Sequence, residues 1–425
     1  MRKEIALLLI TILSLPILCF SQSDTRKNFQ QDYWNNYVGV YSTNDNSAIT
    51  ISLTWGNKLV YTNLETRLFL PLSKKEDDLF ASGDSLQVRF TRNKPNEVTS
   101  LTVEALDGKL EAQKVDIEFE ELSIPSGNAT ISGTLIKPAG EEPFPAVIMN
   151  GGASWIVRDT NLDLALYHVS QGRAAFVYDK RGYGESTGSK TVPFQTTAND
   201  IKSIAEQLQY RVDINPQKIG ISTYSQSGWY GTLASAQSDV ISFQILNVAS
   251  ATTVERQERQ RIKNELQADA FSNTEIQNAL GLFDLMSTFS KTGTNWDEYI
   301  TMRNAHQEKE WFNYLFAPKD NSKETWSWGR MNWLYNPLPA LSKTTIPTLV
   351  LLGEKDQKVL AEVNKSIFEI AFRMAGNRNY KIKVIPDMNH GLETAYKGGR
   401  KEQKTYQYAN GIFQIKEKWL QSILN

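Results

Sequence analysis

Apolar and polar residues alternate along the first part of the chain. In residues 49–55, Ile-Thr-Ile-Ser-Leu-Thr-Trp, every second side chain is apolar, and a Gly56-Asn57 pair separates this stretch from another of the same kind. This is the pattern of a β-hairpin with one buried face. Because similar stretches recur further along, the pattern predicts a small all-β domain over residues 33–115.

A different pattern begins at about residue 116, where short apolar runs are separated by segments with helical periodicity. In one of these segments, Ile201, Ile204, Ala205 and Leu208 have the spacing of a single helical face. Runs that are apolar on both faces are typical of parallel strands covered by helices. The runs lie at residues 146–149, 174–178, 219–221, 243–246, 348–352 and 382–385. The pattern predicts an α/β domain with a doubly wound, mostly parallel sheet over residues 116–425.

The sheet pattern stops between residues 251 and 342, and helical segments take its place. Ser272 is followed three residues later by Glu275, which is the spacing of a capping box at a helix start. Because this segment lies between two strand runs, we expect it to project over the sheet edge as a helical lid. It contains five of the ten tryptophans, at positions 296, 311, 326, 328 and 333. These indoles either pack within the lid or form an apolar wall for an acyl group.

The first 21 residues have the order of a secretory signal peptide: a basic start, an apolar run, and small residues before Gln22. Ser14 and Pro16 interrupt the apolar run, which is already shorter than the roughly 20 residues that cross a bilayer. We therefore expect export to the periplasm or the outside, with no stable membrane insertion of the mature chain. A lipid-modified Cys19 is the alternative, and the bulky Leu18 before it argues against that.

Composition excludes several other classes of protein. The 425 residues allow two or three domains. The chain has 46 basic and 47 acidic residues, so it lacks the excess positive charge that binds a nucleic-acid backbone. Its only cysteine lies in the predicted signal peptide, and no His, Asp or Glu group has a recognisable metal spacing. We expect no metal, no cofactor and no nucleic-acid partner. The oligomeric state is not indicated.

The strongest chemical signal surrounds Ser225. An apolar strand leads into a turn of small residues, and a sequence that favours a helix follows. This is the layout of a nucleophile elbow, in which the residues two before and two after the serine must be small. Here these are Thr223 and Ser227. Centring the turn on Ser222 or Ser227 would put a bulky aromatic residue two positions away, so Ser225 is the candidate nucleophile.

A serine hydroxyl needs a base to accept its proton, normally a histidine oriented by a carboxylate. Of the three histidines, His168 and His306 lie in helical stretches and are expected on the surface or in packing. His390 follows the last apolar run, at the end of a strand where catalytic groups of parallel sheets gather. Asp356 follows the preceding run and is the candidate that orients His390, with Glu354 as the competing carboxylate.

The oxyanion formed during acyl transfer needs backbone donors. The N–H of Gln226, directly after the candidate nucleophile, is one expected donor. The N–H of Gly152, in the glycine-containing loop after the first long strand, is the other. Trp155 and Trp229 flank these positions and are candidate substrate-binding residues.

Taken together, these motifs resemble the α/β-hydrolase superfamily, and within it the secreted bacterial esterase and dienelactone-hydrolase-like branch. The resemblance runs from about residue 117 to the C-terminus, and its most specific part is Asp-Lys-Arg-Gly-Tyr-Gly-Glu-Ser-Thr-Gly at 179–188. It implies the chain order Ser, Asp, His for the triad, and it favours Asp356 because that residue holds the Gly-x-x-Asp position. Two departures stand out: Asn150 replaces a usual histidine and Thr223 a usual glycine.

The resemblance implies hydrolysis of a small acyl substrate, an ester, through an acyl-serine intermediate. A small aminopeptidase or dipeptidyl-peptidase-like amide hydrolase is the alternative, because related folds cleave amides with the same triad. A binding protein that kept the fold and lost turnover is the third hypothesis, motivated by the two departures.

Overall fold

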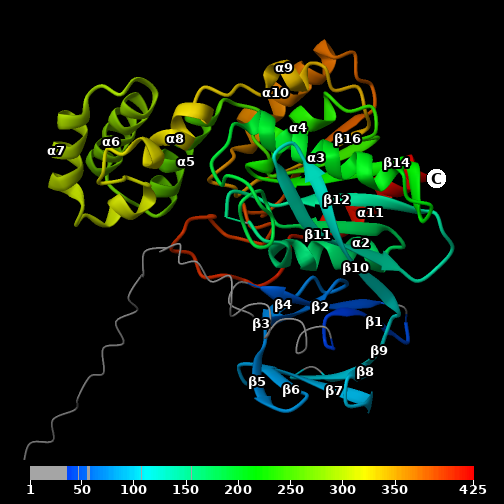
Figure 1. Cartoon of the computed structure of the whole chain (residues 1–425). Coiled ribbons are helices and arrows are strands. Elements are labelled where there is room, and N and C mark those ends of the chain that lie inside the picture. The colour runs from blue at the N-terminus through cyan, green and yellow to red at the C-terminus, as the bar shows by residue number, and fades with distance from the viewer. Residues whose placement is uncertain (1–35, 46, 55–57, 107, 155) are drawn as a thin grey trace, which may run out of the picture.

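The computed structural model describes residues 36–425 except 46, 55–57, 107 and 155 (Figure 1). The predicted signal peptide, the predicted turn at Gly56 and Asn57, and the candidate residue Trp155 therefore lie outside the described residues. Within the described ranges, no helix combines the length and apolarity needed to cross a bilayer.

The N-terminal part of the described chain is a nine-stranded sheet in which every pairing is antiparallel. The strand order is β4-β3-β2-β1-β9-β8-β7-β6-β5. The strands are β1 (Gly39–Thr43), β2 (Ala48–Thr54), β3 (Lys58–Asn63), β4 (Phe69–Pro71), β5 (Ser73–Glu76), β6 (Leu79–Ser82), β7 (Leu86–Lys94), β8 (Glu97–Ala105) and β9 (Gly108–Lys114).

This sheet follows the alternation in its sequence and curls around its apolar face (Figure 1). In β7 the side chains of Leu86, Val88 and Phe90 are buried, while those between them are exposed. The ring of Phe90 lies 6.1 Å from that of Tyr41 on β1, although two strands separate β1 from β7 in the sheet order. The curl therefore brings the two halves of the sheet together over one core.

The second sheet has eight strands in the order β10-β11-β13-β12-β14-β15-β16-β17. A hairpin of β10 and β11 begins it, β11 is antiparallel to both of its neighbours, and the remaining pairings are parallel. Its strands are β10 (Ile117–Ser126), β11 (Ala129–Pro138), β12 (Phe144–Asn150), β13 (Ala174–Tyr178), β14 (Ile214–Tyr224), β15 (Phe243–Asn247), β16 (Thr348–Gly353) and β17 (Tyr380–Ile385). The α/β class predicted from the sequence is confirmed. The β10–β11 hairpin was not among the predicted strand runs.

Helices cover both faces of this sheet. One face packs against α2 (Leu162–Ser170), which follows the short turn η1 (Arg158–Asn161), and against α11 (Ile412–Leu424). The other face packs against α3 (Phe194–Gln209) and α4 (Ser227–Ser235), and α10 (Ala361–Met374) packs near the β16 edge. The four residues whose spacing predicted α3 are all buried.

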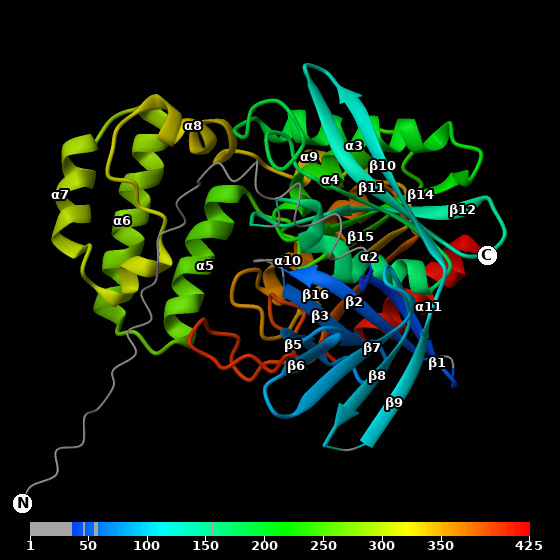
Figure 2. The same ribbon diagram turned by 60° about the horizontal axis from the view of Figure 1, so that its bottom comes forward.

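The two sheets share a core. Buried residues of α2 and α11 belong to the same apolar cluster as Tyr41, Ile49 and Ile51 of the nine-stranded sheet. The N-terminal sheet therefore covers the outer side of α2 rather than hanging from a linker (Figures 1 and 2). Because burial of shared apolar surface is the main favourable term in folding, the two parts stabilise each other.

A helical insertion follows β15 and precedes β16. It consists of α5 (Val254–Ala268), α6 (Asn273–Thr292), α7 (Trp296–His306), η2 (Glu310–Tyr314), α8 (Lys323–Asn332) and α9 (Leu338–Leu341). Helices α5 to α8 form a bundle beside the sheet (Figure 1). The capping box predicted at Ser272 and Glu275 is confirmed, with both of its hydrogen bonds present.

Candidate active site

Ser225 occupies a sharp turn between the end of β14 and the start of α4. Its φ is 55°, in the left-handed region that costs a residue with a Cβ about 1–2 kcal/mol. The turn is held by a hydrogen bond from the Ser225 N–H to the Asn247 carbonyl, 3.0 Å, and by one from the Gly228 N–H to the Ser225 carbonyl, 2.9 Å. These bonds leave the hydroxyl of Ser225 projecting from the tip of the turn, where it lines a pocket.

The two competing serines have structural partners. Ser227 is fully buried, and its hydroxyl donates to the Asn150 carbonyl at 2.7 Å while accepting from the Tyr224 N–H at 2.6 Å. It therefore ties the turn to the end of β12. Ser222 is also buried, and its hydroxyl accepts from the Asn247 side chain at 3.2 Å.

Close packing explains how Thr223 fits at a position where a nucleophile elbow usually has glycine. A Cβ added to Gly231 on α4 would lie 2.4 Å from Cγ2 of Thr223, so the glycine in the helix makes the room that the threonine fills. A Cβ on Gly228 would likewise lie 2.4 Å from that of Ala249. The absence of a side chain at Gly231 therefore compensates for the larger side chain at Thr223.

His390 lies between Ser225 and Asp356. Its Nε2 is 2.9 Å from the Ser225 Oγ, and its Nδ1 is 2.8 Å from Oδ2 of Asp356. The other oxygen of Asp356 accepts from the N–H groups of Lys358 and Val359, at 2.8 and 2.9 Å. The competing Glu354 is exposed and accepts instead from the Asp387 N–H. The carboxylate that reaches the imidazole is therefore that of Asp356.

Tyr224 also contacts His390, and nothing in the sequence marked it. Its hydroxyl donates to the His390 carbonyl, and its ring stands edge-on to the imidazole at 5.7 Å. The other two histidines lie apart from this row: His168 is buried beside Arg173, and His306 packs against Trp311 in the insertion.

The loop after β12 runs beside the serine turn. A Cβ on Gly152 would lie 3.4 Å from that of Ser225, so the glycine allows the main chain to approach the hydroxyl. Among the described residues, no acceptor bonds the N–H of Gly152 or that of Gln226. Asn150 points away from this space, since its amide bonds Tyr178 at 2.7 Å and the Ile148 carbonyl at 3.0 Å.

Lys180, from the Asp-Lys-Arg-Gly motif, supports the same loop from behind. Its ammonium donates to the Gly152 carbonyl and lies 5.7 Å from the centre of the Tyr230 ring. Burial of the amino group lowers the pKa of Lys180 to about 7. The lysine therefore fixes the carbonyl of Gly152, while the same residue lines the pocket.

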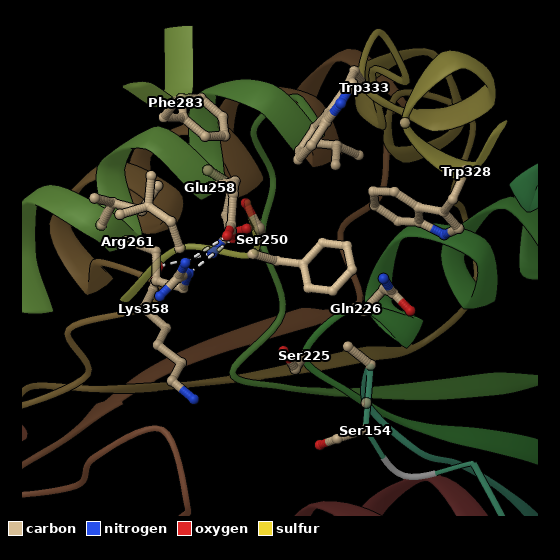
Figure 3. A pocket seen from close by; sticks show the side chains of 18 of the residues that line it. Ser154, Ser225, Gln226, Ser250, Glu258, Arg261, Phe283, Trp328, Trp333 and Lys358 are labelled. Carbon is tan, nitrogen blue, oxygen red and sulfur yellow. Dashed lines mark hydrogen bonds and ion pairs between the residues drawn. The ribbon is translucent and has the colours of Figure 1, made fainter. Parts of the chain in front are cut away.

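A cavity of about 540 Å³ opens above Ser225, between the sheet and the insertion. Figure 3 shows Phe283, Trp328 and Trp333 on the side of the cavity that faces the serine. Of the five insertion tryptophans, Trp326, Trp328 and Trp333 line the cavity, whereas Trp296 and Trp311 pack within the bundle. The candidate Trp229 also lines it, and its indole N–H donates to the Thr252 carbonyl at 3.0 Å.

Charged residues on α5 line another part of the cavity, and sequence reasoning missed them. Arg261 donates to Glu258 at 2.8 Å, as drawn in Figure 3, and also bonds Glu265 and the Tyr314 carbonyl. Arg400 bonds Glu265 from the other side at 2.9 Å. Burial would raise the pKa of Glu265, but the two guanidinium groups outweigh it and hold the pKa below its ordinary value.

The topology of the second sheet identifies the fold. Numbered along the chain, its strands lie in the order 1-2-4-3-5-6-7-8, with the second antiparallel. The serine follows the fifth strand, the aspartate the seventh and the histidine the eighth. The chain has the α/β-hydrolase fold. The inserted helices enter after the sixth strand of this sheet.

Comparisons with known proteins found similar solved structures only at low identity. No protein-family model and no curated protein sequence matches the chain. Among solved structures, an esterase of Pyrococcus furiosus has a TM-score of 0.47 at 14% identity, covering 73% of this chain and 92% of its own. A thermophilic esterase from Thermogutta terrifontis has a TM-score of 0.43 at 17% identity, covering 72% and 100%. Est1E of Butyrivibrio proteoclasticus, solved with ferulic acid, has a TM-score of 0.44 at 15% identity, covering 71% of this chain and 97% of its own. At these scores the likenesses say nothing about what this protein binds or does.

The three candidate side chains are those that nucleophilic catalysis uses. In the part of the chain that the structure describes, no cluster of three or more His, Cys, Asp or Glu side chains has the arrangement of a metal site. The site instead brings together the hydroxyl, imidazole and carboxylate of the three candidate residues.

Proposed function

We propose that this α/β-hydrolase is a serine hydrolase that cleaves carboxylic esters through an acyl-Ser225 intermediate. One observation carries the proposal: the hydrogen-bonded row from Ser225 through His390 to the buried Asp356, with the serine at the floor of a cavity. A hydroxyl aligned with an imidazole and a carboxylate in this order has the geometry for proton removal as it attacks a carbonyl.

The first half of the reaction forms the acyl-enzyme. The Ser225 Oγ attacks the carbonyl carbon while its proton passes to Nε2 of His390, and Asp356 stabilises the imidazolium through Nδ1. The carbonyl oxygen becomes an oxyanion, which the N–H groups of Gln226 and Gly152 receive. The two N–H groups bond no acceptor among the described residues, which supports this role.

The remaining steps complete the acyl-enzyme and then release the acid. Collapse of the first tetrahedral intermediate breaks the bond to the alcohol, which takes the proton from His390, and leaves the acyl-serine. A water then donates a proton to His390 as its oxygen attacks the acyl carbon, and the second intermediate collapses to free acid as His390 returns this proton to the Ser225 Oγ. The residues therefore return to their starting protonation states.

The cavity favours an acyl or alcohol group with a sizeable apolar part. Its wall above Ser225 consists largely of aromatic and aliphatic side chains from the insertion, so an apolar group that enters loses contact with water. The insertion residues that line the wall include Ile262, Phe283, Met286, Trp326, Trp328 and Trp333.

Amide hydrolysis of the aminopeptidase kind receives less support. A substrate amine needs a carboxylate, and the cavity offers Glu258, but Arg261 engages that carboxylate through two hydrogen bonds. Glu265 behind it is shared by Arg261 and Arg400. A pocket carboxylate already paired in this way would have to give up a guanidinium to bind an ammonium group.

Labelling with a fluorophosphonate probe tests the nucleophile. The wild-type protein should incorporate the probe at Ser225, Ser225→Ala should incorporate none, and Ser154→Ala, which removes a different pocket hydroxyl, should label as wild type. Absence of labelling and of turnover in the wild type would favour a binding protein that keeps the fold.

A substrate screen tests the ester preference. We expect p-nitrophenyl esters with medium or bulky apolar acyl groups to be hydrolysed faster than aminoacyl-nitroanilides. Faster turnover of the anilides would replace the esterase proposal with the peptidase alternative.

A further inference from the structure

The loop that carries His390 is long and has little regular structure of its own. It connects the end of β17 at Ile385 to the start of α11 at Ile412. Two residues that flank the histidine have left-handed backbones: φ is 54° at Asp387 and 62° at Leu392. Such conformations cost of order 1–3 kcal/mol each and persist only where surrounding contacts hold them. The contacts that hold this turn therefore decide where the imidazole lies.

The first set of contacts lies within the loop. The side chain of Asn389 closes the turn by accepting from the N–H groups of Gly391 and Glu393 at 2.7 and 3.1 Å. The returning part of the loop then pairs with the turn. The Thr394 N–H donates to the Gln407 carbonyl, and the Ala409 N–H donates to the Leu392 carbonyl, both at 2.8 Å. Residues 392–394 and 407–409 thus form a short antiparallel ribbon beside His390.

The second set of contacts joins this ribbon to the edge of the nine-stranded sheet. The Phe69 N–H donates to the Tyr406 carbonyl at 2.9 Å, and the Tyr408 N–H donates to the Arg67 carbonyl at 2.8 Å. The ring of Phe69 packs against that of Tyr408 with centroids 4.7 Å apart. Figures 1 and 2 both show the orange-red loop lying between this blue sheet and the insertion.

Two side chains reinforce the junction. The Arg67 guanidinium donates to the Tyr408 carbonyl at 2.8 Å, and the Gln407 amide donates to the Thr66 carbonyl at 3.1 Å. A continuous ladder of main-chain hydrogen bonds therefore runs from β4, through residues 406–409, to residues 392–394 and the turn that holds His390.

From this ladder we infer that the N-terminal β-sheet is a positioning element of the active site, in which Arg67 and the β4 edge fix the placement of His390. The inference rests on the proposed function, since it assigns to the sheet the task of holding the general base. Ser225 and Asp356 follow strands of the hydrolase sheet directly, whereas the turn around His390 takes its outermost support from the other sheet.

The expected consequence is kinetic. Loss of the Arg67 contact loosens the ribbon and lets the imidazole leave the line between Ser225 and Asp356, and a displacement of about 1 Å can reduce a rate by up to two orders of magnitude. The residues that line the cavity come mainly from the insertion and the serine turn. The loss should therefore appear in kcat rather than in KM.

The experiment compares Arg67→Ala with Arg89→Ala in the full chain. Arg89 is an arginine of the same sheet whose exposed guanidinium bonds the exposed Glu76 and no other residue of the described ranges. With a p-nitrophenyl ester, Arg67→Ala should lower kcat roughly tenfold with KM within about twofold. It should also shift the ionisation seen in the pH profile of kcat/KM, because the contact of His390 with Asp356 changes. Arg89→Ala should match wild type in all three readouts, and Arg67→Lys should recover part of kcat.

A second variant keeps the result decisive if Arg67→Ala does not fold. Gln407→Ala removes the amide contact from the loop side, at a half-buried position, and should lower kcat severalfold with the thermal midpoint nearly unchanged. Wild-type kcat and pH profile in the folded variants would overturn the inference. If the wild type itself hydrolyses no ester and takes no fluorophosphonate, the proposed function fails instead, so the two failures are distinguishable.

Discussion

The serine side and the histidine side of the site are built in different ways. Ser225 lies in a tight turn whose partners, Asn247 and Gly228, belong to the adjoining strand and helix. His390 lies in a loop whose partners come from β4, from Tyr224, from Lys355 just after β16, and from within the loop itself. The candidate nucleophile is therefore placed by local secondary structure, while the candidate base is also held by segments that are distant in the chain.

The tip of the histidine loop extends this difference to the insertion. The Arg400 N–H donates to Asp269 at the end of α5, at 2.9 Å. A Cβ on Gly399 would lie 2.2 Å from an Asp269 oxygen, and one on Gly398 would lie 1.8 Å from the Lys355 carbonyl. Only glycine allows the loop to pass this close to both neighbours. The loop that carries His390 thus contacts both sheets and the inserted helices above the cavity.

The largest expected effect is on the histidine side, at the carboxylate. Asp356→Asn should reduce kcat/KM by roughly 10³- to 10⁴-fold, because an amide cannot stabilise the imidazolium or select the same tautomer. The matched control is Glu354→Gln, which keeps an oxygen for the Asp387 N–H. Steady-state kinetics that show a larger loss for Glu354→Gln would transfer the orienting role to that residue.

A smaller effect is expected beneath the serine side, at Lys180. Burial lowers its pKa to about 7, whereas the unfolded side chain titrates near 10.5. Below pH 7 the buried amino group is charged in the folded state, so the lysine contributes least to the free energy of unfolding there. As pH rises from about 7 to 10.5 the unfolded chain keeps a proton that the folded chain has released, so the free energy of unfolding rises.

Urea unfolding at pH 7 and pH 9.5 measures this contribution. Between these pH values we expect the free energy of unfolding of the wild type to rise by roughly 1 to 3 kcal/mol, a value reduced because Lys180 is partly accessible to solvent. Lys180→Met should lack this rise. Lys365→Met, at an exposed position on α10, should keep the wild-type dependence. Equal pH dependence in wild type and Lys180→Met would show that the amino group keeps its ordinary pKa.

The smallest effect concerns the packing that accommodates Thr223. Gly231→Ala should destabilise the fold, since the new Cβ overlaps Cγ2 of Thr223, and Thr223→Ser should relieve the overlap by removing that methyl group. A double-mutant cycle cancels the helix propensity of alanine and should give a favourable coupling of about 1 kcal/mol. Additive free energies of unfolding would mean that the helix shifts and the two residues are independent.

Local patterns explain why much of the molecule could be anticipated. The run before Ser225, the small residues around it and the capping box at Ser272 each act within a few residues, so strand, turn and helix starts are visible in the chain. The small residues around the turn selected Ser225, the place after the last apolar run selected His390, and Asp356 was favoured over Glu354. The β10–β11 hairpin was overlooked because its strands continue directly from the all-β pattern before them.

Other features depend on contacts that no local pattern encodes. The pairing of Arg261 with Glu258 and Glu265, the support of Gly152 by Lys180, and the separation of the insertion tryptophans into lining and packing residues follow from how helices meet in space. Each of these residues has an unremarkable sequence neighbourhood.

The sequence by itself determined the α/β class, the strand and helix periods, and a turn in which Ser225 had no equal competitor, because these depend on side-chain size and polarity over short distances. Only the tertiary structure decided which carboxylate reaches His390 and what holds that histidine in place. The reason is physical: the loop of His390 takes its shape from hydrogen bonds to Arg67, Phe69 and other distant partners, and such bonds exist only after both sheets have packed together.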